Sequence, residues 1–145
     1  MASPIEDQLF SALLDTVPHW YWLTEADETA VLHWSRDRIA FAFRDEPLLT
    51  YRADILLTPG RPRPQRGFAL AIECDGHDFH DRTKQQAAYD RSRDRELLLR
   101  NVVTIRTGSE IFHSPERCAA EALEVFARLA ERASDPEPCS AAWGG

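Results

Sequence analysis

Acidic residues stand inside two apolar stretches of the chain, where a carboxylate is costly to bury. Asp54 lies within residues 51–57, and Glu73 and Asp75 close the stretch 68–75. Both stretches have the composition of strands, and because side chains alternate along a strand, Glu73 and Asp75 share one face. Two adjacent, partly desolvated carboxylates raise each other's pKa unless a cation neutralises them. The pattern therefore predicts a cation beside these acids.

The donor atoms indicate which cation this is. If the two strands pair as a hairpin, Asp54 faces Glu73 across the ladder, and with Asp75 three carboxylates converge at one end of a sheet. Carboxylate oxygens suit Mg²⁺, for which Mn²⁺ can substitute, and such ions also bind phosphate oxygens. A metal held in this way activates water and neutralises the charge that develops on a phosphate. The chemistry predicted is phosphodiester hydrolysis, with these three acids as catalytic residues and metal ligands.

The order of these residues resembles the PD-(D/E)XK nuclease superfamily and, within it, the small very-short-patch-repair-like endonucleases. The similarity spans roughly residues 3–130 and is carried by Asp54, the run from Glu73 through Gly76 to His80, the spacing Asp90-x-x-Arg93-Asp94-x-x-Leu97, and Ile105-Arg106. It implies an α/β fold with a restriction-endonuclease-like core, αβββαβ(α), in which a mixed four-stranded sheet is flanked by helices.

The same resemblance implies roles for individual residues. Asp54 and Glu73 would bind the metal, and the backbone carbonyl of Cys74 would add a third ligand. Glu6, on the first helix, would match the accessory N-terminal glutamate of the superfamily.

One position departs from the superfamily's motif. The lysine usually found two residues after the glutamate is replaced by Asp75, which binds a metal but supplies no positive charge. Two catalytic replacements are open: Lys84, at the start of the next helix, and His80, a general base with an ordinary pKa of about 6.5. His77 is a third, accessory candidate.

A second group of charges lies on the helix expected over residues 83–100. The residues at one-face spacing are Asp90, Arg93, Asp94 and Leu97. Leu97 indicates that this face packs inward, so its charges need partners, which Arg106 on the following strand or Arg52 can supply. We expect Asp90, Asp94 and Arg106 to be accessory residues that position the metal site.

Arginines outside that face are candidates for contact with DNA. They are Arg91 and Arg95 on the helix and Arg61, Arg63 and Arg66 in the basic loop 58–67. Contacts of this kind hold phosphates without reading the base sequence. A solvated or ion-paired helix surface is the alternative interpretation.

Simpler roles are also open for the other groups. Glu6 stands where a capping box at the first helix would place it. His77 and His80 could bind zinc with Asp75, although no further ligand pair follows. The strand carboxylates could be ion-pair partners of nearby arginines instead of metal ligands.

Hydrophobic periodicity and capping residues predict the elements that position these groups. Helices are expected over residues 3–15, 83–100 and 114–133, and strands over 39–43, 49–57, 68–75 and 102–106. A short strand is expected over 31–34, and the prolines of 58–67 should exclude that loop from a ladder. Residues 1–133 then form a single nuclease-like domain, and 134–145 a disordered tail.

Composition and charge restrict the class of protein. A chain of 145 residues with 43% hydrophobic and 28% charged residues fits one globular domain and excludes a two-domain enzyme. The net charge of −7 argues against binding nucleic acid by bulk charge, yet residues 51–107 carry eleven basic and eight acidic side chains. Without a long apolar run, a signal peptide or paired cysteines, the protein is expected in the cytoplasm and away from membranes.

These observations predict a Mg²⁺-dependent endodeoxyribonuclease, a hydrolase that cuts DNA with metal-activated water. So small a chain holds little beyond a catalytic core, so targeting is expected from a homodimer or a partner protein. The alternative is a nuclease fold that has lost hydrolysis and binds nucleic acid or a protein partner. The missing lysine and the acidic net charge favour that alternative.

Overall fold

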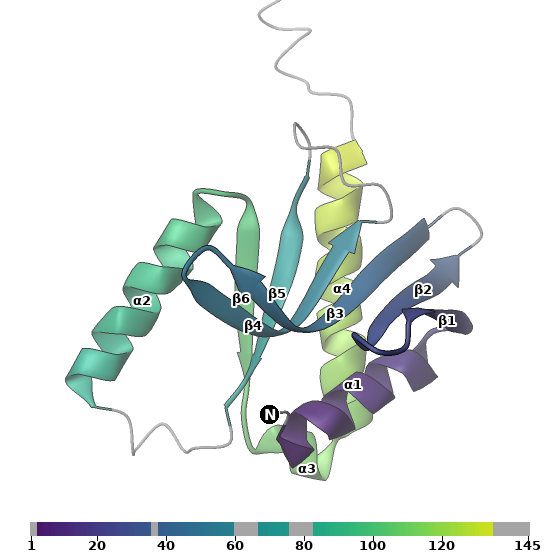
Figure 1. The fold of residues 1–145 in the computed structure, drawn as a ribbon, viewed down its shortest axis with the longest axis horizontal. Coiled ribbons are helices and arrows are strands. Elements are labelled where there is room, and N and C mark those ends of the chain that lie inside the picture. Colours follow the sequence, from purple (N-terminus) through teal and green to yellow (C-terminus); the bar gives the residue numbers. More distant parts are fainter. Residues whose placement is uncertain (1–2, 36–37, 60–66, 76–82, 135–145) are drawn as a thin grey trace, which may run out of the picture.

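The computed structural model describes residues 3–35, 38–59, 67–75 and 83–134, which form an α/β fold (Figure 1). The strands are β1 (His19–Thr24), β2 (Thr29–Ser35), β3 (Arg38–Leu48), β4 (Tyr51–Pro59), β5 (Ala69–Cys74) and β6 (Val102–Thr107). The helices are α1 (Pro4–Thr16), α2 (Lys84–Leu98), α3 (Glu110–His113) and α4 (Pro115–Ser134).

The six strands form one mixed sheet in their sequence order, β1-β2-β3-β4-β5-β6. Neighbours from β1 to β5 are antiparallel, and β5 and β6 are parallel. The parallel pair needs a crossover, which α2 supplies, because parallel strands cannot be joined by a tight turn. In the register of the β4–β5 hairpin, Ile55 pairs with Ile72 and Leu57 with Leu70.

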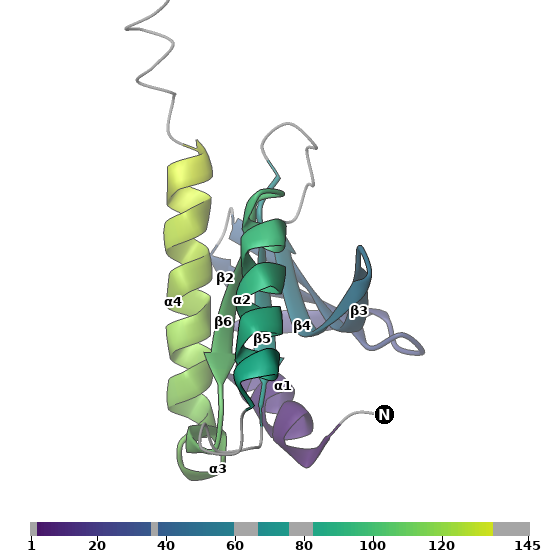
Figure 2. The same ribbon diagram turned by 90° about the vertical axis from the view of Figure 1, so that its left-hand side faces the viewer.

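Helices cover both faces of the sheet (Figures 1 and 2). The larger core cluster lies between one face and the helices α1 and α4, with Leu9, Leu32, Ile72 and Phe126 fully buried. The smaller cluster lies on the opposite face, where Leu97 of α2 packs on small residues of the central strands. Alternate residues of β5 therefore face different helices.

Most predicted elements are confirmed, with boundaries shifted by a few residues. Local signals explain this agreement: Ser3 caps α1 by accepting from the Glu6 N–H at 3.3 Å, and Thr83 opens α2 with a capping box. The predicted strand 49–57 starts instead at Tyr51, because Leu49, with φ of 59°, lies in the turn after β3.

The predicted four-stranded sheet is wrong, because the described sheet has six strands. Residues 31–34 are part of the longer strand β2, and β1 was not predicted. Trp20 and Trp22 of β1 pack toward the larger cluster, while Tyr21 and Leu23, which alternate with them, are exposed on this edge strand. The aromatic composition of β1 is typical of a strand, but the run is only six residues long.

Three further boundaries differ from the predictions. The short helix α3 was not predicted. β4 continues through Thr58 and Pro59, which pair with Phe41 and Ala40, so the predicted loop begins later than residue 58. The loop residues 60–66 and the tail residues 135–145 lie outside the described part of the chain, and Ser134 ends α4. In the described ranges, no helix is long and apolar enough to span a membrane.

Candidate functional site

The acids on β4 and β5 face different helices. Glu73 is 7% exposed and forms an ion pair with Arg93 of α2. Asp54 accepts a hydrogen bond from the backbone N–H of Cys74 at 2.8 Å and interacts with Glu6 of α1. The hairpin itself is as predicted, but the carboxylates at its end are directed to opposite sides of the sheet.

A kink in the adjacent strand accompanies this separation. Asp45 of β3 has φ of 48°, and it lies between the pairs Arg44–Ile55 and Glu46–Ala53, level with Asp54. Regular alternation would place residues 53 and 55 on one face. Instead Ala53 belongs to the smaller cluster and Ile55 to the larger one. The alternation of side chains along β4 therefore shifts at Asp54, so the Asp54 side chain lies on the α1 side of the sheet and not on the α2 side.

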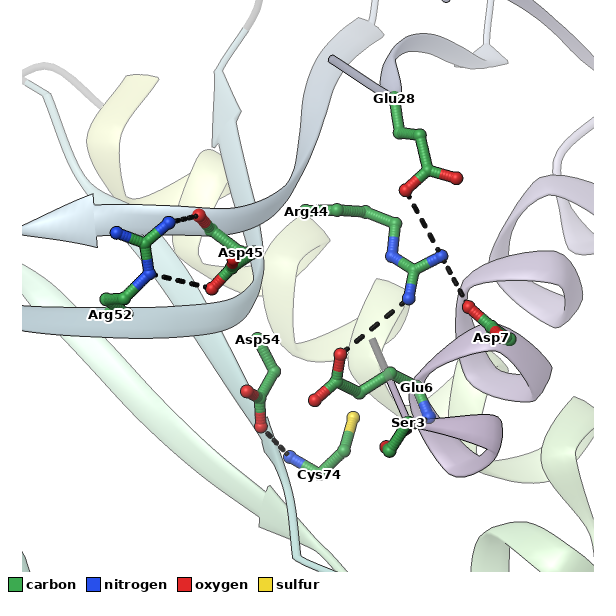
Figure 3. A network of polar contacts seen from close by, with 9 residues as sticks. All are labelled: Ser3, Glu6, Asp7, Glu28, Arg44, Asp45, Arg52, Asp54 and Cys74. Carbon is green, nitrogen blue, oxygen red and sulfur yellow. Dashed lines mark hydrogen bonds and ion pairs between the residues drawn. The ribbon is translucent and has the colours of Figure 1, made fainter. Parts of the chain in front are cut away.

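The carboxylates of Glu6 and Asp54 form a close pair at this end of the sheet (Figure 3). Burial, together with the charge of Asp54 and a hydrogen bond to it, raises the pKa of Glu6 from 4.5 to about 7. The positive charge of Arg44 opposes this shift without cancelling it. Glu6 therefore keeps its proton up to near neutral pH and is hydrogen-bonded to Asp54, and a divalent cation bound there would take the place of that proton.

Arg44 of β3 completes the α1 side of the site (Figure 3). Its side chain is 7% exposed, and its Nη2 lies 3.7 Å from Glu6. Nη1 lies 2.7 Å from Asp7 and 3.5 Å from Glu28, and the guanidinium stands over the ring of Phe10. Arg44 was not among the residues predicted for the site, and the available signal was an arginine directly after the apolar run 39–43.

Cys74, at the end of β5, lies beside Asp54 and Glu6 (Figure 3). Burial and the negative charge of Asp54 raise the pKa of its thiol from 9.0 to about 12. The thiol is therefore protonated at neutral pH and is neither a nucleophile nor a thiolate ligand. The backbone N–H of Cys74 donates a hydrogen bond to Asp54 and so helps to fix that side chain. The resemblance implies a different role for the Cys74 carbonyl, which would be a metal ligand.

On the α2 side, Glu73 is surrounded by two arginines. Arg93 contacts it directly, and Arg106 is its register partner on β6. Arg106 in turn lies 2.9 Å from Asp94 and 3.9 Å from Asp90, which confirms the predicted partner for these aspartates. Arg52, the other candidate, pairs with Asp45 at 2.8 Å.

Tyr51 holds Arg93 against the sheet. The guanidinium lies 5.6 Å from the centre of the Tyr51 ring, and the Tyr51 hydroxyl donates to Glu96 at 2.6 Å. Burial and the nearby charge of Arg106 lower the pKa of Arg93. Its buried Nε has no hydrogen-bond partner in the described part of the chain. The sequence placed Arg93 on the inward face but gave it no role at Glu73.

The remaining predicted residues are distributed as follows. Asp75 directly follows β5, and its N–H donates to the Thr107 carbonyl at 2.8 Å. Lys84, Arg91 and Arg95 are exposed on α2, away from Glu73. The predicted groups outside the described residues are His77, His80, Arg61, Arg63 and Arg66.

The residues present fit a divalent cation only in part. In the described ranges, no three His, Cys, Asp or Glu side chains are grouped as a metal site. Glu6 and Asp54 offer two adjacent carboxylates, the donor type that Mg²⁺ prefers. Glu73 is already neutralised by Arg93. A site centred on Glu6 and Asp54 is therefore the arrangement these residues support.

Comparison with known proteins identifies no relative: no family model matches the chain, and neither a curated protein nor a solved structure is similar to it.

Proposed function

We propose that this protein is a Mg²⁺-dependent endodeoxyribonuclease of restriction-endonuclease-like fold. The observation that carries the proposal is the Glu6–Asp54 carboxylate pair at the end of β4, beside the strand that bears Glu73. Arg44 offsets only part of the cost of bringing these acids together, and a bound divalent cation would offset more of it. The order α1, antiparallel strands, α2 and parallel β6 agrees with the core that the resemblance implies, with two strands added.

Each residue has a definite role in this proposal. Glu6 and Asp54 would hold Mg²⁺, with the Cys74 carbonyl as a further donor. The metal would supply an activated water and neutralise charge on the scissile phosphate. Arg93, which contacts Glu73, brings the positive charge that the motif's lysine would have supplied. Asp90 and Asp94 hold Arg106 beside it.

This assignment changes the candidates for the missing lysine. Lys84 is exposed at the start of α2, whereas Arg93 lies on the inward face of the same helix. Arg93 replaces Lys84 as the cation nearest Glu73. His80 stays a candidate general base from the sequence.

The second candidate function is a nuclease fold that binds nucleic acid or protein without cutting it. The Glu73–Arg93 ion pair favours it, because a glutamate neutralised by an arginine has no remaining charge to offer a metal. In that case the site residues stabilise the fold, and metal addition changes nothing.

Cleavage of supercoiled plasmid distinguishes the two functions. We expect relaxation or linearisation in Mg²⁺ or Mn²⁺ and none in EDTA. Asp54→Asn and Glu6→Gln should abolish cleavage, because each removes a carboxylate from the proposed metal site. Arg93→Lys should retain part of the activity and Arg93→Met should lose it, since only the lysine keeps a positive charge beside Glu73.

Asp15→Asn is the matched control, because it removes an exposed carboxylate from the other end of α1. It should cut like the wild type. Cleavage that persists in EDTA, or in the Asp54→Asn variant, would overturn the proposal. Folded wild-type protein that never cuts DNA in either metal would favour the binding module.

A further inference from the structure

The acidic and basic side chains of α2 point in different directions. Its carboxylates are engaged on the sheet side: Asp90 and Asp94 approach Arg106, and Glu96 accepts from Tyr51. Three cations on the same helix are exposed instead, Lys84, Arg91 and Arg95. None of these three side chains makes a hydrogen bond or ion pair with another residue in the described ranges.

The three cations lie in one line. In an α-helix each residue turns by about 100°, so a step of seven residues returns a side chain to within about 20° of the same direction and a step of four to within about 40°. Lys84, Arg91 and Arg95 are related by these two steps. At about 1.5 Å per residue the line is roughly 17 Å long. We call these three residues the α2 basic stripe.

The length of the α2 basic stripe suits a nucleic-acid strand. Phosphates of one DNA strand advance by about 3.4 Å each along the helix axis, so three cations spread over roughly 17 Å can each contact a different phosphate. When exposed cations without an internal partner bind a polyanion, they displace the counterions condensed on it. The three stripe residues stand about 160–180° around the helix from Arg93, which faces Glu73, so a strand bound to the stripe is held on the outer surface of α2.

We infer that the α2 basic stripe binds the phosphate backbone of DNA. This deepens the proposed function and rests on it for the choice of DNA as the polyanion. It also gives Lys84 a different role, because Lys84 then holds phosphate together with Arg91 and Arg95 and does not take the place of the motif's lysine.

The salt dependence of DNA binding tests this inference. Fluorescence anisotropy of a labelled duplex, with the full chain in EDTA so that no cutting occurs, gives the affinity over a range of salt concentrations. The slope of log affinity against log salt changes by about 0.9 for each phosphate that is no longer neutralised. Arg91→Ala/Arg95→Ala should therefore reduce the slope by about 1.8, and adding Lys84→Ala should reduce it by about 0.9 more.

The matched control removes the same charge elsewhere. Arg117 and Arg128 are exposed on α4, which packs on the opposite face of the sheet. Arg117→Ala/Arg128→Ala should leave the slope unchanged. Circular dichroism confirms that all variants fold, which is expected because every substituted side chain is exposed.

The outcomes separate this inference from the proposed function. Binding weakened in the stripe variants without any plasmid cleavage by the wild type supports the stripe and overturns the nuclease. Cleavage with an unchanged salt slope in the stripe variants overturns the stripe alone. Equal reductions of the salt slope in the stripe and control variants would show that DNA binding depends only on net charge, and this would overturn the inference about the stripe. Binding of the wild type to phosphatidylserine vesicles but not to DNA would also overturn it.

Discussion

At the scale of single residues, Arg44 is expected to have a large effect on stability. Its buried guanidinium faces carboxylates from α1 and from the turn before β2. Arg44→Met leaves Glu6 beside Asp54 without the cation that opposes their repulsion. We expect a decrease of roughly 2–4 kcal/mol in the free energy of unfolding. This is less than the loss expected for a fully buried ion pair, because two of the carboxylates that face Arg44, Asp7 and Glu28, are half exposed. Urea unfolding measures it.

Arg52 provides the comparison for Arg44. It approaches Asp45 at 2.8 Å, closer than Arg44 approaches Glu6, but both members of the Arg52–Asp45 pair are exposed. Arg52→Met should leave the urea midpoint nearly unchanged, because water already solvates this pair. Equal decreases for the two variants would show that burial is not what makes Arg44 important.

Glu6 makes stability depend on pH. Its pKa is raised to about 7, so between about pH 4.5 and 7 the folded protein binds a proton that the unfolded chain has released. Stability from this group is therefore highest below about pH 4.5 and falls as the pH rises through about 7. Urea midpoints across this interval should fall less steeply in Glu6→Gln than in the wild type.

Asp15→Asn again serves as the control for Glu6→Gln. It should keep the wild-type slope, because Asp15 is exposed at the end of α1. Identical slopes in the wild type and Glu6→Gln would contradict the raised pKa.

At the scale of elements, α2 is attached to the sheet by a narrow contact. Leu97 is 1% exposed, whereas the next residue, Leu98, is 58% exposed. Leu97→Ala should cost about 2–5 kcal/mol of unfolding free energy, because it leaves a cavity in the smaller core cluster. Leu98→Ala should change it by less than about 0.5 kcal/mol. Urea unfolding of both variants measures the difference, and similar decreases would contradict the packing of this face.

Prediction of the elements succeeded where the signal is local. Ser3 and Thr83 at the N-caps indicate α1 and α2, and apolar runs indicate β4 and β5. β1 was missed although its aromatic residues are typical of strands, because the run is short and only pairing with β2 makes it a strand. The position of Asp54 was not predictable either, because it depends on the kink at Asp45 in a neighbouring strand.

At the scale of the whole molecule, the net charge of −7 attracts cations in general, so specific binding of Mg²⁺ has to be separated from screening. A metal that binds only the folded protein stabilises it by mass action. Mg²⁺ should raise the melting temperature of the wild type more than KCl of matched ionic strength does. Asp54→Asn should lack this additional rise, and Asp15→Asn should keep it. An equal rise in all three proteins would indicate only general screening of the acidic surface.

The sequence by itself determined the three longer helices, the central hairpin and the presence of acids within its apolar strands, because periodicity, capping and composition are local properties. It also predicted that Asp90 and Asp94 face inward and need Arg106 or Arg52 as a partner, and the structure has Arg106 in that place. The tertiary structure alone decided that Asp54 meets Glu6 while Glu73 meets Arg93. The reason is physical: a strand's direction is local, but the face that each side chain takes at a kink depends on the strand beside it and on the helix that packs there.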